Sequence, residues 1–129
     1  MPVTALYAAL LTPLFVVLSV RVIAMRRGSG ATLGDGGDPD LLRRMRVQAN
    51  FAEYVPFALI LLGLAESLHS PNWFLRGLGL ALLIGRLSHA IGVSRSNEQF
   101  GFRVTGVALT LTVLIVAALG CLYGAIHSW

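Results

Sequence analysis

Residues 104–125 read VTGVALTLTVLIVAALGCLYGA, a run without a single charged side chain. An α-helix needs about 20 predominantly apolar residues to cross the hydrocarbon core of a bilayer. This run is long enough to cross once, and it lies within a longer segment, residues 99–127, for which we expect a continuous helix. The stretch therefore predicts an integral membrane protein rather than a soluble domain.

The remainder of the chain has the composition of a membrane protein as well. Its 129 residues are 56% hydrophobic and 12% charged, whereas soluble domains are about 25% charged. Three further segments, residues 3–25, 39–67 and 72–93, are long and apolar enough to be spans. We therefore expect a single domain over residues 1–129 with an all-α fold, an integral membrane four-helix bundle.

The basic residues indicate how the bundle is oriented. All ten are arginines, and they gather near the first and third connections, whereas only Arg76 flanks the second. Because Lys and Arg are enriched in cytoplasmic loops, we expect these two connections in the cytoplasm and both termini on the non-cytoplasmic side. The arginines form no long basic face, so nucleic acid is not an expected partner. The first group is Arg26, Arg27, Arg43, Arg44 and Arg46, and the second is Arg95 and Arg103.

Aromatic residues and the single cysteine have simpler interpretations. Aromatic side chains near the non-cytoplasmic ends of the spans are typical of an interfacial belt. Cys121, alone in an apolar run, excludes an intrachain disulfide and a Cys-based metal site, so it reads as a small packing residue and no metal is expected. The expected belt residues are Tyr7, Trp73, Tyr123 and Trp129.

A polar stripe runs along the segment 39–67. At about 100° per residue, Arg46, Asn50 and Glu53 fall on one face of a helix, with Arg43 beside them and Tyr54 on the flank. Glu53 directly precedes a purely apolar stretch, residues 54–65, and so lies below the headgroups. Translocon-based scales give about 2.5–3.5 kcal/mol for a charged group at mid-bilayer. The stripe is therefore expected to face protein or a polar cavity.

The third and fourth helices carry matching groups toward the predicted cytoplasmic end. Arg86 and His89 are one turn apart on one face of the third helix, and Arg103 stands at the start of the fourth. Arginines hold carboxylates in bidentate fashion, and Glu53 would hold an ammonium group. Such a set would fit a small zwitterionic anion.

A structural interpretation competes with this ligand site. Arg46 and Glu53 could pair with Arg86 and simply join the helices, and the spacing alone does not decide between the two. Taken singly, His89 reads as a packing or interfacial histidine. Arg26 and Arg27, taken singly, read as anchors of the topology.

The stretch RRMRVQANFAEYVP, residues 43–56, resembles the signature of the MAPEG family, the membrane-associated proteins of eicosanoid and glutathione metabolism. In the family pattern, Asn follows Arg by four residues and Glu follows Asn by three. A Tyr comes directly after the Glu, and a Pro comes two residues after the Tyr. The matching residues are Arg46, Asn50, Glu53, Tyr54 and Pro56. The resemblance implies a homotrimer that binds glutathione as cosubstrate between adjacent subunits, near the cytoplasmic ends of the helices.

The resemblance also implies roles for individual residues. Arg103 would polarise the glutathione thiol, and Arg27 would assist a leaving group or polarise the electrophile. The implied activity is a transferase or peroxidase reaction of detoxification, in which the glutathione thiolate attacks lipophilic electrophiles or hydroperoxides. By position, the glutathione-binding residues would be Arg46, Gln48, Asn50, Glu53, Tyr54, Arg86 and His89.

Two positions on the third helix narrow these expectations. His89 and Val93 stand where the eicosanoid synthases of the family carry tyrosines, which argues against a specialised eicosanoid synthase. The chain looks more like the bacterial branch of the family, and this implies a bacterial inner membrane. The alternative is a non-catalytic membrane module whose stripe binds lipid headgroups or another anionic metabolite.

Overall fold

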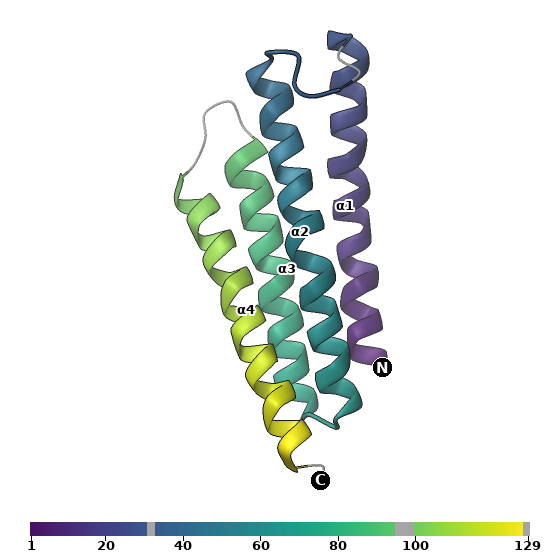
Figure 1. Ribbon diagram of the computed structural model, residues 1–129, viewed down its shortest axis with the longest axis vertical. Helices are drawn as coiled ribbons and strands as arrows, with labels where there is room; N and C mark the ends of the chain where they lie inside the picture. Colours follow the sequence, from purple (N-terminus) through teal and green to yellow (C-terminus); the bar gives the residue numbers. More distant parts are fainter. Residues whose placement is uncertain (31–32, 95–99, 128–129) are drawn as a thin grey trace.

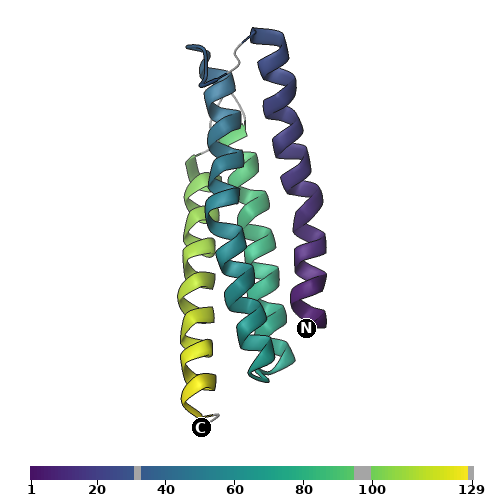
Figure 2. The same ribbon diagram turned by 45° about the vertical axis from the view of Figure 1, so that its right-hand side comes forward.

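The computed structural model of the protein describes residues 1–30, 33–94 and 100–127. Four antiparallel helices run side by side, with α2 and α3 in the middle and α1 and α4 on the outside (Figures 1 and 2). All four are long and apolar enough to cross a membrane, which confirms the predicted all-α membrane bundle. Their bounds are α1 (Pro2–Ser29), α2 (Pro39–Ser67), α3 (Asn72–Ser94) and α4 (Phe100–His127).

The helix bounds agree with the expected spans except at the end of α1. The apolar run stops at Met25, but the helix continues through Arg26 and Arg27 to Ser29. Basic side chains in a last turn interact favourably with the carbonyl end of the helix dipole. Gly30 then ends the helix in the left-handed conformation, at φ 71°. The start expected for the fourth helix, at Gln99, lies outside the described residues.

The N-terminal turn of α1 is capped by a side chain from another helix. Helix α1 begins with Pro2, and the backbone amides of Val3 and Thr4 are the next donors without a partner inside the helix. The Glu66 carboxylate, near the end of α2, accepts both of them, at 2.9 and 2.8 Å, and also the Thr4 hydroxyl at 2.7 Å. This contact ties α1 to α2 at the end of the bundle away from the first connection.

Helices α3 and α4 approach closely through glycines. A Cβ added at Gly106 would lie 2.6 Å from both the Gly85 carbonyl oxygen and the His89 backbone nitrogen. Small residues at such crossings allow two membrane helices to pack backbone against backbone. The close crossing fixes α4 against the face of α3 that carries His89.

The structure removes one residue from the expected aromatic belt. Trp73 and Tyr123 are exposed on the outside of the bundle, at 77% and 66%. Tyr7 is instead buried, because its ring occupies the space left free by Gly79 on α3. Trp129, like Arg95 of the third connection, lies outside the described residues.

Both chain ends lie at the same end of the bundle. The start of α1 and the end of α4 lie on opposite sides of the bundle but at the same end, away from the connection between α1 and α2 (Figure 1). Because an even number of spans returns the chain to its starting side, this arrangement agrees with termini on one side of the membrane. It places the polar first turns of α2 and the arginine-rich end of α1 on the other side.

Candidate functional site

The stripe on α2 presents two opposite charges on the surface of the four-helix bundle. The side chains of Arg46 and Glu53 are 58% and 54% exposed, and Arg46 Nη1 lies 3.9 Å from a Glu53 carboxylate oxygen. This distance is beyond hydrogen-bond range, so the two groups attract each other without being bonded. Both can therefore accept further partners on the outer face of α2.

A buried arginine lies beneath the stripe. The Arg86 side chain on α3 is 2% exposed, and its Nη1 donates a hydrogen bond of 2.5 Å to Asn50 Oδ1. Its Nε and Nη2 are also buried, and within residues 1–30, 33–94 and 100–127 they have no acceptor. Arg86 lines a narrow crevice between α2, α3 and α4, together with Tyr54 and Thr110. Arg86 is thus a buried cation with only one of its hydrogen-bonding nitrogens paired.

This arrangement replaces the structural pairing considered for the stripe. Arg86 does not pair with Glu53; its partner is the Asn50 amide, and Glu53 is near Arg46 on its own helix. The polar contact between α2 and α3 therefore joins the Arg86 guanidinium to a neutral amide. The two charged members of the stripe are left on the surface.

The other expected site residues lie at different depths. His89 is buried, at 5% exposure, where α3 meets Gly106 of α4. Tyr54 is half-buried beside the crevice. Gln48 is half-buried and, by the helical period, points away from Arg46. The structure thus brings Asn50, Tyr54 and Arg86 together and places Gln48 apart from them.

The two expected catalytic arginines are exposed at helix ends. Arg27 lies in the last turn of α1, and Arg103 lies in the first turn of α4. Both stand toward the end of the bundle that holds the first turns of α2. The N-terminal end of a helix disfavours a cation electrostatically, so the helix dipole does not favour Arg103 at this position.

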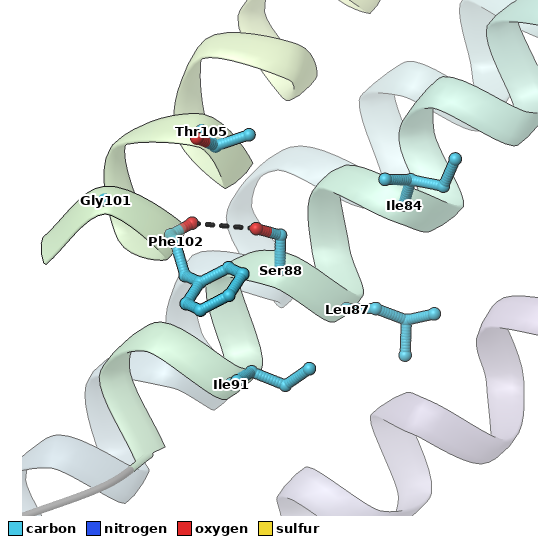
Figure 3. A pocket seen from close by; sticks show the side chains of 7 residues that line it. All are labelled: Ile84, Leu87, Ser88, Ile91, Gly101, Phe102 and Thr105. Atoms are coloured by element: carbon cyan, nitrogen blue, oxygen red, sulfur yellow. Dashed lines mark hydrogen bonds between the residues drawn. The ribbon is translucent and has the colours of Figure 1, made fainter. Parts of the chain in front are cut away.

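A sizeable cavity lies away from the stripe. It is an open groove of about 790 Å³ between the first turns of α4 and the outer face of α3 (Figure 3). Across it, the Ser88 hydroxyl donates to the Phe102 carbonyl oxygen at 3.0 Å. Its α3 residues are mostly exposed, whereas Arg86 is buried, so the groove and the stripe use different faces. The lining residues are Ile84, Leu87, Ser88, Ile91, Gly101, Phe102 and Thr105.

Sequence reasoning did not identify two of these features. The groove is lined by apolar and small residues that are ordinary in any membrane helix, so no residue pattern signals it. Glu66 is an acid at the end of an apolar segment, and only the fold shows that its carboxylate reaches the start of α1. Both features depend on which helices become neighbours.

The fold and the stripe together define a small four-helix integral membrane protein with an ionisable face inside one span and a buried arginine behind it. Residues 4–123 match the MAPEG family. The chain is also 32% identical over 121 residues to the inner membrane protein YecN of Escherichia coli K12, across 94% of this chain and 91% of YecN. YecN of Escherichia coli O6:H1, strain CFT073, matches to the same extent. The chain belongs to the MAPEG family, as the signature in residues 43–56 predicts.

Proposed function

We propose that the protein binds glutathione on the α2 stripe and activates its thiolate for attack on lipophilic electrophiles or hydroperoxides. The observation that carries this proposal is the exposed pair of Arg46 and Glu53 on a membrane helix of a MAPEG protein. Glutathione has carboxylates and an ammonium group. An arginine binds the former and a glutamate binds the latter, so the stripe has complementary charges for both ends of the tripeptide.

The chemistry requires a cation near the sulfur. A free thiol has a pKa of about 8.5, and its thiolate is the nucleophile. A nearby positive charge favours the ionised form. In this proposal Arg103 is that charge and Arg27 polarises the electrophile or its leaving group. In conjugation the sulfur bonds to the electrophilic carbon, the leaving group departs with its electron pair, and the thiol proton passes to solvent.

A second element of the proposal is a homotrimer with the site between subunits. Glu53 lies at the middle of α2, where about 1.5 Å per residue puts it roughly 20 Å from either helix end. Ionisable groups inside spans face protein or a polar cavity rather than lipid. The half-exposed Arg46 and Glu53 of one protomer would then be covered by a neighbouring subunit and by the ligand. One subunit would supply only part of the pocket.

The proposal also assigns a side of the membrane to each end. The arginines of the first connection and its flanks favour a cytoplasmic position for that end, and both termini would then lie on the opposite side. The arginine-rich end of the site would then face the cytoplasm, where glutathione is made. The related YecN is described as an inner membrane protein, which supports the same membrane for this chain.

Thermal unfolding of the detergent-solubilised protein, with and without glutathione, tests the proposal. A ligand that binds only the folded state stabilises it by about 2.7 kcal/mol at one hundred times its Kd. We expect stabilisation of the wild type and conjugation of a chlorinated nitrobenzene. Glu53→Gln should lose both, whereas Arg76→Gln, an exposed arginine at the far end of α3, should keep both.

The same experiment separates the alternative function. A wild type that gains no stability from millimolar glutathione and conjugates nothing contradicts the proposal. Stabilisation by an anionic phospholipid in that case would identify the stripe as a headgroup-binding surface. Each result follows from the same protein preparation, because only the added ligand differs.

A further inference from the structure

The contact between Arg86 and Asn50 fixes the direction of an amide group. A guanidinium carries only donors, so the Asn50 atom that faces Arg86 must be its oxygen. The hydrogen bond runs from Arg86 Nη1 to Asn50 Oδ1. The nitrogen Nδ2, with its two donors, therefore points away from Arg86. A carboxamide alone in this place could turn either way, and the arginine removes that freedom.

The Asn50 side chain belongs to the stripe. Asn50 is half-buried and stands between Arg46 and Glu53 on the same helical face. Among the described residues Nδ2 has no hydrogen-bond partner, yet it is not one of the fully buried unpaired atoms, so it reaches the surface. The stripe thus presents a cation, an oriented donor and an anion in succession.

Arg86 itself is shielded from a ligand on this surface. Its side chain is 2% exposed, and the crevice in front of it, bordered by Tyr54 and Thr110, is too narrow for a water molecule. Its charge is still felt, because a hydrogen bond from an ionised donor polarises the amide that accepts it and strengthens the amide's own donors.

We infer that Arg86 is a positioning residue that holds Asn50 with Nδ2 turned outward, so that Asn50 donates to a carboxylate or carbonyl oxygen of the ligand on the stripe. This inference rests on the proposed glutathione site and names the atom that recognises an acceptor there. It also assigns Arg86 an indirect role, through Asn50, in place of direct contact with glutathione.

The variant Asn50→Asp tests the direction of the amide. An aspartate still accepts from Arg86, so the α2–α3 contact is kept and the melting temperature should not fall. Its outward atom is now an acceptor that repels a carboxylate. We expect the affinity for glutathione, measured by equilibrium dialysis, to fall at least tenfold, which is about 1.4 kcal/mol. The matched control Asn72→Asp, exposed at the start of α3, should bind normally.

A double-mutant cycle tests whether Arg86 acts through Asn50. Arg86→Lys should raise the KM for glutathione about tenfold and leave kcat within about twofold, because the ligand-binding donor is misdirected while the thiol site is intact. In an Asn50→Ala background the same change should alter KM less than about twofold. Equal losses in both backgrounds would contradict a positioning role.

The outcomes distinguish this inference from the proposed function. Normal glutathione binding by Asn50→Asp overturns the positioning role and leaves the proposed function standing. A wild type that binds no glutathione overturns both. Should Arg86→Lys fail to fold, the dialysis result for Asn50→Asp decides the inference alone.

Discussion

The change Glu66→Ala tests how α1 is attached to the bundle. In the structure the Glu66 carboxylate accepts three hydrogen bonds from the first turn of α1, two from the backbone amides of Val3 and Thr4 and one from the Thr4 hydroxyl. A side chain from α2 thus performs the capping that a residue before the helix usually provides. Removing it leaves the two amides and the hydroxyl without this acceptor.

The size of the effect follows from those bonds. Loss of a helix N-cap costs about 0.5–2 kcal/mol, and a hydrogen bond to a charged group contributes about 1.5–3 kcal/mol. The contact is only partly buried, so water replaces some of what is lost. We expect the first turn of α1 to open more easily by about 2 kcal/mol, which corresponds to roughly 30-fold faster amide exchange.

Hydrogen exchange of the N-terminal peptide, followed by mass spectrometry, measures this directly. Glu66→Gln should fall between wild type and Glu66→Ala, because one acceptor oxygen remains. Ser67→Ala is the control, since its exposed hydroxyl bonds only within α2. Exchange of Glu66→Ala within twofold of wild type, or equal exchange in the Gln and Ala variants, would refute the capping role.

Three further predictions concern packing, chemistry and topology. Gly106→Ala puts a Cβ 2.6 Å from backbone atoms of α3 and should cost about 1–3 kcal/mol of stability. The control Gly101→Ala, whose added Cβ would have nothing within 4 Å, should leave the melting temperature unchanged. Equal melting temperatures for the two variants would contradict the close crossing of α3 and α4. Arg103→Leu should raise the pKa of the bound glutathione thiol, read from thiolate absorbance, and an unchanged pKa would remove Arg103 from the mechanism. Ser29→Cys in a Cys121→Ala background should react with an impermeant maleimide only in inside-out vesicles, and labelling of intact cells would reverse the proposed orientation.

The sequence predicts the fold well because lipid leaves few choices. A span must be helical and about 20 apolar residues long, so the four apolar runs identify four helices. Apolar runs do not predict features that depend on other properties, such as where a helix ends or which side chains are buried. Helix α1 continues beyond Met25 because arginines are compatible with a last turn and Gly30 supplies the left-handed ending. Tyr7 is buried because Gly79 of α3 makes room for its ring, which only the packing of α1 on α3 reveals.

The candidate site is predictable within one helix and not between helices. The helical period places Arg46, Asn50 and Glu53 on one face, and the structure has them there. The partner of Arg86 depends on how α2 and α3 cross, and the sequence alone suggests Arg46 and Glu53. In the structure the partner is Asn50, and the hydrogen bond from Arg86 orients the Asn50 amide.

Native mass spectrometry of the detergent-solubilised protein with glutathione tests the central claim most directly, because one spectrum reports both subunit number and bound ligand. We predict a mass of three chains that takes up glutathione, with uptake lost in Glu53→Gln while the trimer remains. A monomer, or a trimer that binds glutathione equally well without the Glu53 carboxylate, would contradict a glutathione site built on the α2 stripe and completed by a neighbouring subunit.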